Sequence, residues 1–423
     1  MNETPSLGPS RPLRVCLLSA EYPPARGGVG DYTRLLAAAL AQLGLAVTVL
    51  TGRRPAPLKG HPPGVGLHTP VSGWGYGSWS PVVRMVREVA PDVVHIQYQT
   101  AAYGMHPAIN LLPWRLRASG FAGRVVTTFH DLRPPYLFPK AGELRHLPAL
   151  ALAGGSDRVV LVAREHWQTT PLAWLRRLQP DLARRTHVIP IGSNIPDQPP
   201  AGYDRSAWRA GLGIAPDDLV LVFFGYLNDS KGGDDLLSAL SSLRARGHSA
   251  KLLMVGGEGQ SNASDEGWRQ RFEQDILRLG LTGAVLHTGF APATAVSGHL
   301  LAGDICVLPF RDGATFQRGS LLAALGHGLA TVSTSPPGPT LSVDDQLPQG
   351  WSGDAALRHG ANIWLVSPHR PDDLVAAVER LSVDRELRAC LGEGAKNLSQ
   401  LLTWPAIARQ HVELYRQIGE PDN

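Results

Sequence analysis

Two basic residues stand at the starts of predicted helices in the second half of the chain. Lys231 lies in SKGGDD, a glycine turn between an apolar strand and a helix. Arg318 begins RGSLLAALGHG, in which an Ala/Leu-rich helix follows another apolar strand. Backbone N–H groups at a helix N-terminus favour anions, and an added cation strengthens that preference. The pair therefore predicts a diphosphate site, with a solvated turn lysine as the alternative for Lys231.

Two stretches of the first half could also carry chemistry. His130 follows a predicted strand in FHDLRPP, where it would meet a ligand beyond the strand's carboxyl end unless it is a structural histidine. The loop EYPPARGGVGDY opens a helix, and its glycines either bring backbone N–H groups to an anion or a hydroxyl group or form a tight turn. The candidates in this loop are Gly27, Gly28, Gly30 and Asp31. No dinucleotide or Walker fingerprint is present.

Alternating apolar runs and helical stretches must position these residues. The runs lack polar alternation, which is typical of parallel strands covered on both faces and joined by helices. The predicted strands are residues 13–19, 46–51, 92–97, 124–129, 158–163 and 187–191, then 218–225, 250–257, 284–289, 304–310, 329–334 and 362–367.

The Pro/Gly-rich segment 192–204 separates the two sets of strands and is the best linker candidate. The pattern predicts an α/β protein with two doubly wound, Rossmann-like domains, residues 1–195 and residues 196–402. Residues 403–423 would form a helix that packs back on the first domain, and residues 1–11 would be disordered.

Composition excludes several classes of protein. The 423 residues are 43% hydrophobic and 18% charged, as expected for a globular protein with two cores. The net charge of +4 is spread along the chain, which argues against a nucleic-acid partner. Three single cysteines predict neither a disulfide framework nor a metal site. The longest apolar run, 219–227, is too short to span a bilayer. A cytoplasmic protein is expected, with peripheral membrane contact open through the Arg-rich stretch 173–185.

The ordered motifs resemble the retaining GT-B glycosyltransferases of the glycogen-synthase and sucrose-phosphate-synthase type, from about residue 13 to 418. They are PPARGGVGDYTRLLAAALAQLGLAVTVLT, TFHD, VIPIGSN, GYLNDSKGGDDLLSAL, LLMVGGEG, VLHTGF and PFRDGATFQRGSLLAALGHGLATVST. The resemblance implies a GT-B fold with two domains facing across a cleft, in which residues 1–195 form the acceptor-side domain and residues 196–402 the nucleotide-sugar domain. The glycine loop would then serve the acceptor or a phosphate. It implies transfer, with retention, of a sugar from a nucleoside-diphosphate donor to a carbohydrate, lipid-linked or small-molecule acceptor. Neither an obligatory metal nor a cofactor besides this co-substrate is implied.

The same resemblance, together with the loops above, assigns the site. His130, Lys231 and Arg318 would be the catalytic residues. The donor would contact Gly225, Tyr226, Lys231, Gly289, Phe290, Asp312, Gly313, Arg318, Gly319 and Ser320.

The chain also departs from the family. Thr315 and Ala323 stand where the family has two glutamates, and Tyr226 replaces an arginine. We expect Arg318 to supply the missing guanidinium, whose fork binds two phosphate oxygens, and Asp312 to contact the sugar hydroxyls. Two alternatives stay open, a non-catalytic nucleotide- or sugar-binding protein and a nucleotide-sugar epimerase or hydrolase. The donor base, the linkage and the oligomeric state are not predicted.

Overall fold

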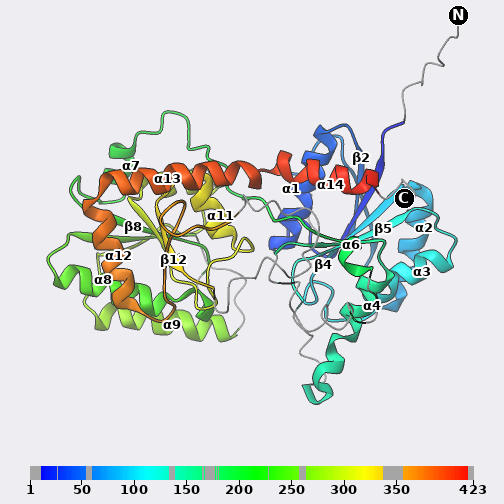
Figure 1. The fold of residues 1–423 in the computed structure, drawn as a ribbon, viewed down its shortest axis with the longest axis horizontal. Helices are drawn as coiled ribbons and strands as arrows, with labels where there is room; N and C mark the ends of the chain where they lie inside the picture. The colour runs from blue at the N-terminus through cyan, green and yellow to red at the C-terminus, as the bar shows by residue number, and fades with distance from the viewer. Residues whose placement is uncertain are drawn as a thin grey trace, which may run out of the picture. The chain divides into compact units, whose positions relative to one another are not determined.

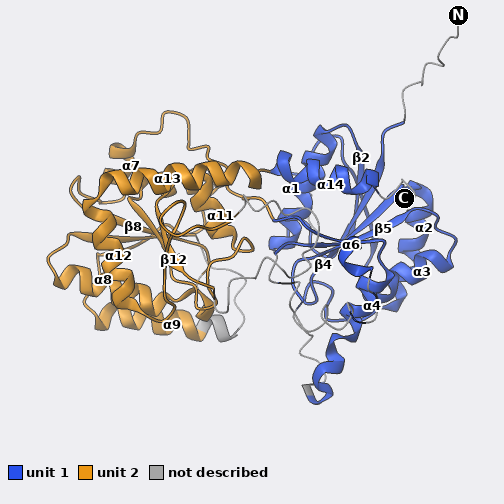
Figure 2. Ribbon diagram, in the orientation of Figure 1, with its two compact units in different colours: residues 1–190, 346–351, 404–423 blue, residues 191–345, 352–403 orange. Residues whose placement is uncertain are grey.

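The computed structural model describes residues 11–25, 27–53, 60–132, 139–163, 181–226, 228–256, 263–336 and 356–417, with residues 166, 177 and 179. The chain divides into two compact units (Figure 2). Unit 1 comprises residues 1–190, 346–351 and 404–423, and unit 2 comprises residues 191–345 and 352–403. The predicted disorder of residues 1–11 lies outside the described residues except at Arg11, which donates two hydrogen bonds to the Asp92 carboxylate.

Unit 1 is built on a seven-stranded sheet in the order β3-β2-β1-β4-β5-β6-β7, and all neighbouring strands are parallel. Its strands are β1 (Arg14–Ser19), β2 (Ala46–Gly52), β3 (Gly66–Val71), β4 (Val93–Tyr98), β5 (Arg124–Phe129), β6 (Arg158–Leu161) and β7 (Thr186–Val188). Its helices are α1 (Gly28–Gln42), α2 (Trp79–Val89), α3 (Leu112–Ala118), α4 (Leu147–Gly155), α6 (Leu182–Arg185) and α14 (Trp404–Gln417). Every residue of β4 is buried, as expected of a central parallel strand.

The C-terminal helix α14 packs beside α1 in unit 1 (Figure 1). Buried polar contacts fix it there. The Tyr415 hydroxyl lies 2.6 Å from Nδ1 of His95, whose Nε2 lies 2.7 Å from the Thr128 hydroxyl. The Tyr32 hydroxyl of α1 lies 3.0 Å from Nε2 of His411. His95 is thus a satisfied core histidine, because both ring nitrogens have partners and the side chain is fully buried.

Unit 2 contains a six-stranded parallel sheet in the order β10-β9-β8-β11-β12-β13. Its strands are β8 (Leu219–Phe224), β9 (Ala250–Val255), β10 (Val285–His287), β11 (Ile305–Leu308), β12 (Thr331–Thr334) and β13 (Trp364–Val366). Its helices are α7 (Arg205–Gly211), α8 (Gly233–Ala245), α9 (Ala263–Arg278), α10 (Ala293–Ala302), α11 (Gly319–Gly326), α12 (Pro371–Val383) and α13 (Arg385–Ser399).

Two parallel sheets confirm the predicted α/β fold class, and all twelve predicted strands are present. Strand β3 was not predicted. It lies at the edge of its sheet, contains Pro70 and is mostly half-buried, so its sequence lacks a continuous apolar run. The strand order reverses between β1 and β4 in unit 1 and between β8 and β11 in unit 2. Ligands of doubly wound sheets bind beyond the carboxyl ends of the strands at such a reversal.

Candidate active site

The two predicted cations of unit 2 lie at the point where its strand order reverses. Lys231 ends the short 3-10 helix Asp229–Lys231 that follows β8, and Arg318 precedes α11, which follows β11. Strands β8 and β11 are neighbours in the sheet, although two strands separate them in the sequence. The carboxyl ends of neighbouring parallel strands share one edge, so the two loops meet there.

Both cations lie near one aromatic ring, that of Phe310. The Lys231 Nζ atom and the Arg318 guanidinium carbon each lie 4.9 Å from the centroid of the Phe310 ring. Cation–π attraction to the ring holds each charge in place. Burial and the positive charge of Arg318 lower the pKa of Lys231 to about 8, although Asp312 acts in the opposite direction. The charge of Arg318 thus acts on Lys231, and two neighbouring cations favour the binding of an anion.

Direct backbone contact fixes the two loops against each other. Gly232 has a φ of +65°, and a Cβ atom there would lie 2.0 Å from the carbonyl oxygen of Pro309. The Arg311 N–H donates to the Ser230 carbonyl at 3.1 Å. The Arg311 guanidinium also pairs with Asp234 at 2.8 Å and with Asp229 at 3.4 Å. These contacts hold the turn that carries Lys231 against the segment that follows β11.

The carboxylate of Asp312 pairs with the Arg318 guanidinium. Arg318 is mostly buried, whereas Asp312 is exposed. The pair balances the arginine charge in the free protein and orients its fork. An arriving phosphate would compete with Asp312 for the same N–H groups. The predicted contact of Asp312 with a sugar hydroxyl stays a prediction.

The other predicted donor residues lie around the same strand ends. Gly225 (φ +131°) follows β8, and a Cβ atom there would contact Ser320 of α11 at 3.7 Å. Gly256 pairs with Gly289 across the ends of β9 and β10. Tyr226 and Phe290 are exposed, and Ser320 is buried in the first turn of α11. Gly313 (φ +83°) packs so tightly against Pro336 that a side chain would clash, whereas Gly319 has open space around it.

Thr315 and Ala323, the positions at which the resemblance led us to expect glutamates, carry no carboxylate. Ala323 is completely buried in α11, and its carbonyl accepts hydrogen bonds from the His327 N–H at 3.0 Å and from His327 Nδ1 at 2.7 Å. Thr315 lies in the loop before the helix, and its carbonyl accepts from the Arg318 N–H at 3.1 Å. This bond holds Arg318 in the turn that precedes α11.

In unit 1, His130 lies among buried polar and aromatic groups. Its Nε2 lies 3.0 Å from Oε1 of Gln97, at the end of the neighbouring strand β4. The Tyr32 ring meets the His130 ring edge-on at 4.6 Å. Burial and repulsion from two neighbouring histidines lower the pKa of His130 to about 3, so the ring is neutral. Because an amide oxygen only accepts, Nε2 carries the proton, and Nδ1 is the acceptor that His130 can offer a ligand.

The glycine loop begins α1 as predicted, but its glycines differ in their surroundings. Gly30 lies against the backbone of Tyr22, where a Cβ atom would be 3.1 Å from the Tyr22 nitrogen. A Cβ atom on Gly27 would overlap the Glu21 carboxyl group, whereas Gly28 faces open space. Burial raises the pKa of Asp31 in the first turn of the helix, and Arg34 partly offsets that shift. Of the three glycines, Gly28 is exposed, Gly27 is half-buried and Gly30 is buried, so Gly28 is the most accessible to a ligand.

Sequence reasoning missed three residues of these sites. Phe310 and Arg311 end the predicted strand 304–310 and begin its loop, and nothing in the local pattern separates them from ordinary core and surface residues. Gln97 is fully buried in a strand of otherwise apolar or aromatic character. A buried amide at the carboxyl end of a strand is a usable signal, because such groups require a partner.

The described residues contain no group of three His, Cys, Asp or Glu side chains arranged to hold a metal ion. Within the same residues, no helix is both long and apolar enough to cross a membrane.

Comparison with known proteins places both halves of the chain. Residues 26–192 match the family model described as Glycosyltransferase Family 4, and residues 218–384 match Glycosyl transferases group 1. A D-inositol 3-phosphate glycosyltransferase of Paenarthrobacter aurescens is 26% identical over 417 residues, which are 92% of this chain and 93% of that protein. An uncharacterized glycosyltransferase of Methanocaldococcus jannaschii is 21% identical over 427 residues, 96% of this chain and 98% of the relative.

Solved structures share the fold. The sucrose-phosphate synthase of Thermosynechococcus elongatus superposes with a TM-score of 0.71 at 21% identity, covering 96% of this chain and 99% of the other. HepE of Anabaena, solved with UDP and glucose, has a TM-score of 0.70 at 20% identity, covering 96% and 100%. These neighbours confirm the predicted GT-B fold.

Proposed function

Because this chain is a glycosyltransferase, with a Glycosyltransferase Family 4 domain followed by a Glycosyl transferases group 1 domain, we propose that unit 2 binds a nucleoside-diphosphate sugar through Lys231 and Arg318. The placement of both cations 4.9 Å from the Phe310 ring, beside the start of α11, carries this proposal. A diphosphate there would meet a lysine, an arginine fork and free helix N–H groups.

The same groups would promote the reaction. Breaking the bond between sugar and phosphate builds negative charge on the leaving diphosphate, and preorganised cations stabilise this charge as it develops. Each lost contact of this kind costs about 2.7–4 kcal/mol in other enzymes. We propose transfer with retention and without an obligatory metal, in which the leaving phosphate helps to take the acceptor proton.

In unit 1, His130 would steady the donor sugar through the free acceptor on Nδ1, and Gly28 would present its backbone to the acceptor or a phosphate. The neutral ring suits hydrogen bonding to a hydroxyl better than proton donation. His130 therefore acts as a positioning group in this proposal rather than as a general acid.

The relatives indicate which substrates to test first. HepE was solved with UDP and glucose, so UDP-glucose is the first donor. Several relatives are named D-inositol 3-phosphate glycosyltransferase, so a phosphorylated polyol is the first acceptor. Peripheral membrane contact through residues 173–185 stays part of the proposal, although most of this stretch lies outside the described residues. Within it, Arg185 already binds Asp181 and the Ser156 carbonyl.

The deciding experiment measures UDP and GDP affinity by calorimetry for the wild type, Lys231→Ala and Arg318→Ala. A charge-assisted hydrogen bond contributes about 1.5–3 kcal/mol, so each variant should bind the preferred nucleotide roughly 10- to 100-fold more weakly. The matched controls are Lys251→Ala, which loses a surface bond to the Gly283 carbonyl, and Arg246→Ala, which loses a surface pair with Glu379. Unchanged affinity in Arg318→Ala alone would remove the arginine from the site. Binding of every donor without turnover, with acceptors supplied, would contradict transfer.

A further inference from the structure

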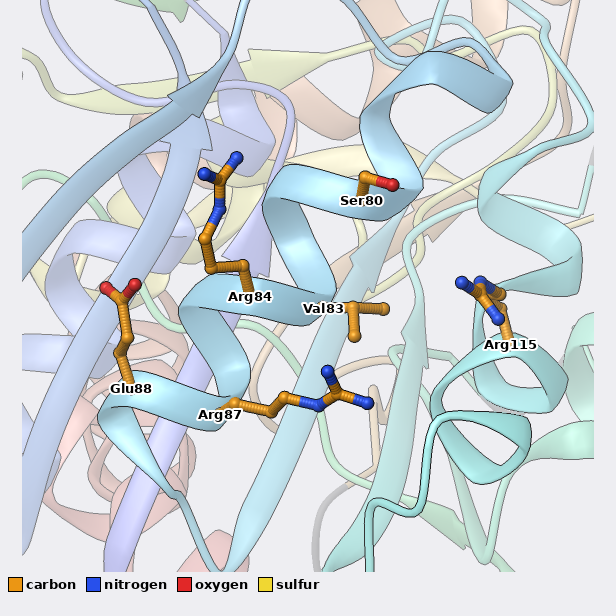
Figure 3. A pocket seen from close by; sticks show the side chains of 6 residues that line it. All are labelled: Ser80, Val83, Arg84, Arg87, Glu88 and Arg115. Atoms are coloured by element: carbon orange, nitrogen blue, oxygen red, sulfur yellow. The ribbon is translucent and has the colours of Figure 1, made fainter.

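Unit 1 has a surface hollow that the transfer site does not use. It lies between α2 and α3, has a volume of about 450 Å³, and is lined by Ser80, Val83, Arg84, Arg87, Glu88 and Arg115 (Figure 3). Five of these six residues come from α2, at spacings that place them along one side of the helix. The residues assigned to transfer in unit 1 instead follow strands β1 and β5.

The charges in this hollow are unbalanced. Three arginines face one glutamate, and the ion pairs of the described residues include none of the three arginines. Figure 3 shows the side chain of Arg87 extending from α2 towards α3, which carries Arg115, with Val83 on the same side of α2. Glu88 and Arg84 lie together at the edge of this face that is farther from Arg115. The part of the hollow that Arg87 and Arg115 line is therefore positive, and the buried side chain of Val83 adds an apolar surface to it.

Helix dipoles explain only part of this arrangement. Arg87 and Arg115 lie in the last turns of α2 and α3, where cations are favourable. Arg87 Nη2 also donates to the carbonyl of Ser119 at the end of α3, at 2.7 Å. The dipoles would be satisfied equally well by side chains extended into water. They do not account for three arginines and a single glutamate around one hollow, because like charges placed near each other repel.

We propose that the hollow between α2 and α3 binds a phosphate group, held between the guanidinium groups of Arg87 and Arg115. The hydroxyl of Ser80, near the start of α2, supplies one more hydrogen-bond donor to the same hollow. Arginine forks match the oxygens of a phosphate and would lose their mutual repulsion once it binds. The phosphate belongs either to a free phosphorylated metabolite or to an anionic lipid headgroup.

The test is site-resolved modification of arginines by phenylglyoxal on the full chain, followed by mass spectrometry. Saturating UDP is present throughout, so that phosphate cannot report through the nucleotide site. Four additions are compared with sodium chloride at equal ionic strength. Two are soluble, inorganic phosphate and glycerol 3-phosphate. The other two are vesicles, of phosphatidylcholine with phosphatidylglycerol and of phosphatidylcholine alone. Arg409, an exposed arginine of α14 in the same unit, is the internal control.

A bound phosphate should slow modification of Arg87 and Arg115 at least threefold, and leave Arg409 unchanged. Protection by inorganic phosphate or glycerol 3-phosphate identifies a free ligand, and protection only by the anionic vesicles identifies a lipid headgroup. Equal modification in every condition, or equal protection of Arg409, overturns the proposal. The variants Arg87→Gln and Arg115→Gln should each lower the affinity for the protecting ligand about tenfold, whereas Arg409→Gln should leave that affinity unchanged.

Discussion

The pH dependence of nucleotide binding follows from the environment of Lys231. Its pKa of about 8 means that the ammonium is mostly charged at pH 7 and mostly neutral at pH 9. A diphosphate stabilises the charged form and so raises this pKa, which requires the protein to take up a proton on binding above pH 8. Nucleotide affinity should therefore fall as the pH rises.

The size of the effect follows from the same pKa. If only the charged lysine binds well, the apparent affinity scales with the charged fraction, which drops about tenfold between pH 7 and pH 9. The terminal phosphate of UDP has a pKa near 6, so its ionisation is largely complete in this range and cannot cause a decline. We expect UDP to bind about tenfold more weakly at pH 9 than at pH 7.

Calorimetry in two buffers of different ionisation enthalpy measures both the affinity and the protons taken up. The variant Lys231→Met should bind weakly at every pH, with no proton uptake. The variant Lys231→Arg stays charged and should bind with little change between pH 7 and pH 9. Equal wild-type affinity at the two pH values, or a tenfold decline that persists in Lys231→Met, would refute the reasoning.

Three further predictions concern Arg318 and two residues that lie next to other candidate residues, Gly232 beside Lys231 and Gln97 beside His130. Gly232→Ala should lower the free energy of unfolding of unit 2, measured in urea, by about 2–4 kcal/mol, because the added methyl group clashes with the Pro309 carbonyl and alanine is strained at positive φ. The control is Gly213→Ala. Gly213 also has a positive φ, +71°, but open space around it, so this variant should lose only about 1 kcal/mol. Arg318→Lys keeps the charge but loses the fork, so UDP affinity should lie between those of the wild type and Arg318→Ala. Gln97→Leu should remove the hydrogen bond that selects the tautomer of His130. The ¹⁵N NMR spectrum should then show a mixture of the two neutral tautomers of the ring, and kcat/KM should fall about tenfold. Gln97→Glu keeps an acceptor for Nε2 and should preserve the tautomer.

The sequence alone was sufficient to predict most of the strands and the α/β class of the fold. Twelve strands, the Pro/Gly-rich segment and the C-terminal helix could be located because buried parallel strands are continuous apolar runs, which is a local property. The edge strand β3 could not be predicted in this way, because its partial exposure and Pro70 interrupt the apolar run. Lys231 and Arg318 could also be found, since helix starts with glycine turns are visible in the sequence.

Only the tertiary structure decided how those residues meet. Lys231 and Arg318 are 87 positions apart in the chain, and the reversal of strand order makes β8 and β11 neighbours. Contact between the two loops then brings both charges close to the Phe310 ring. Burial, together with the charge of Arg318, lowers the pKa of Lys231. Burial and electrostatic coupling depend on distances between segments remote in sequence, so neither the role of Phe310 nor the pairing of His130 with Gln97 could be read from local patterns.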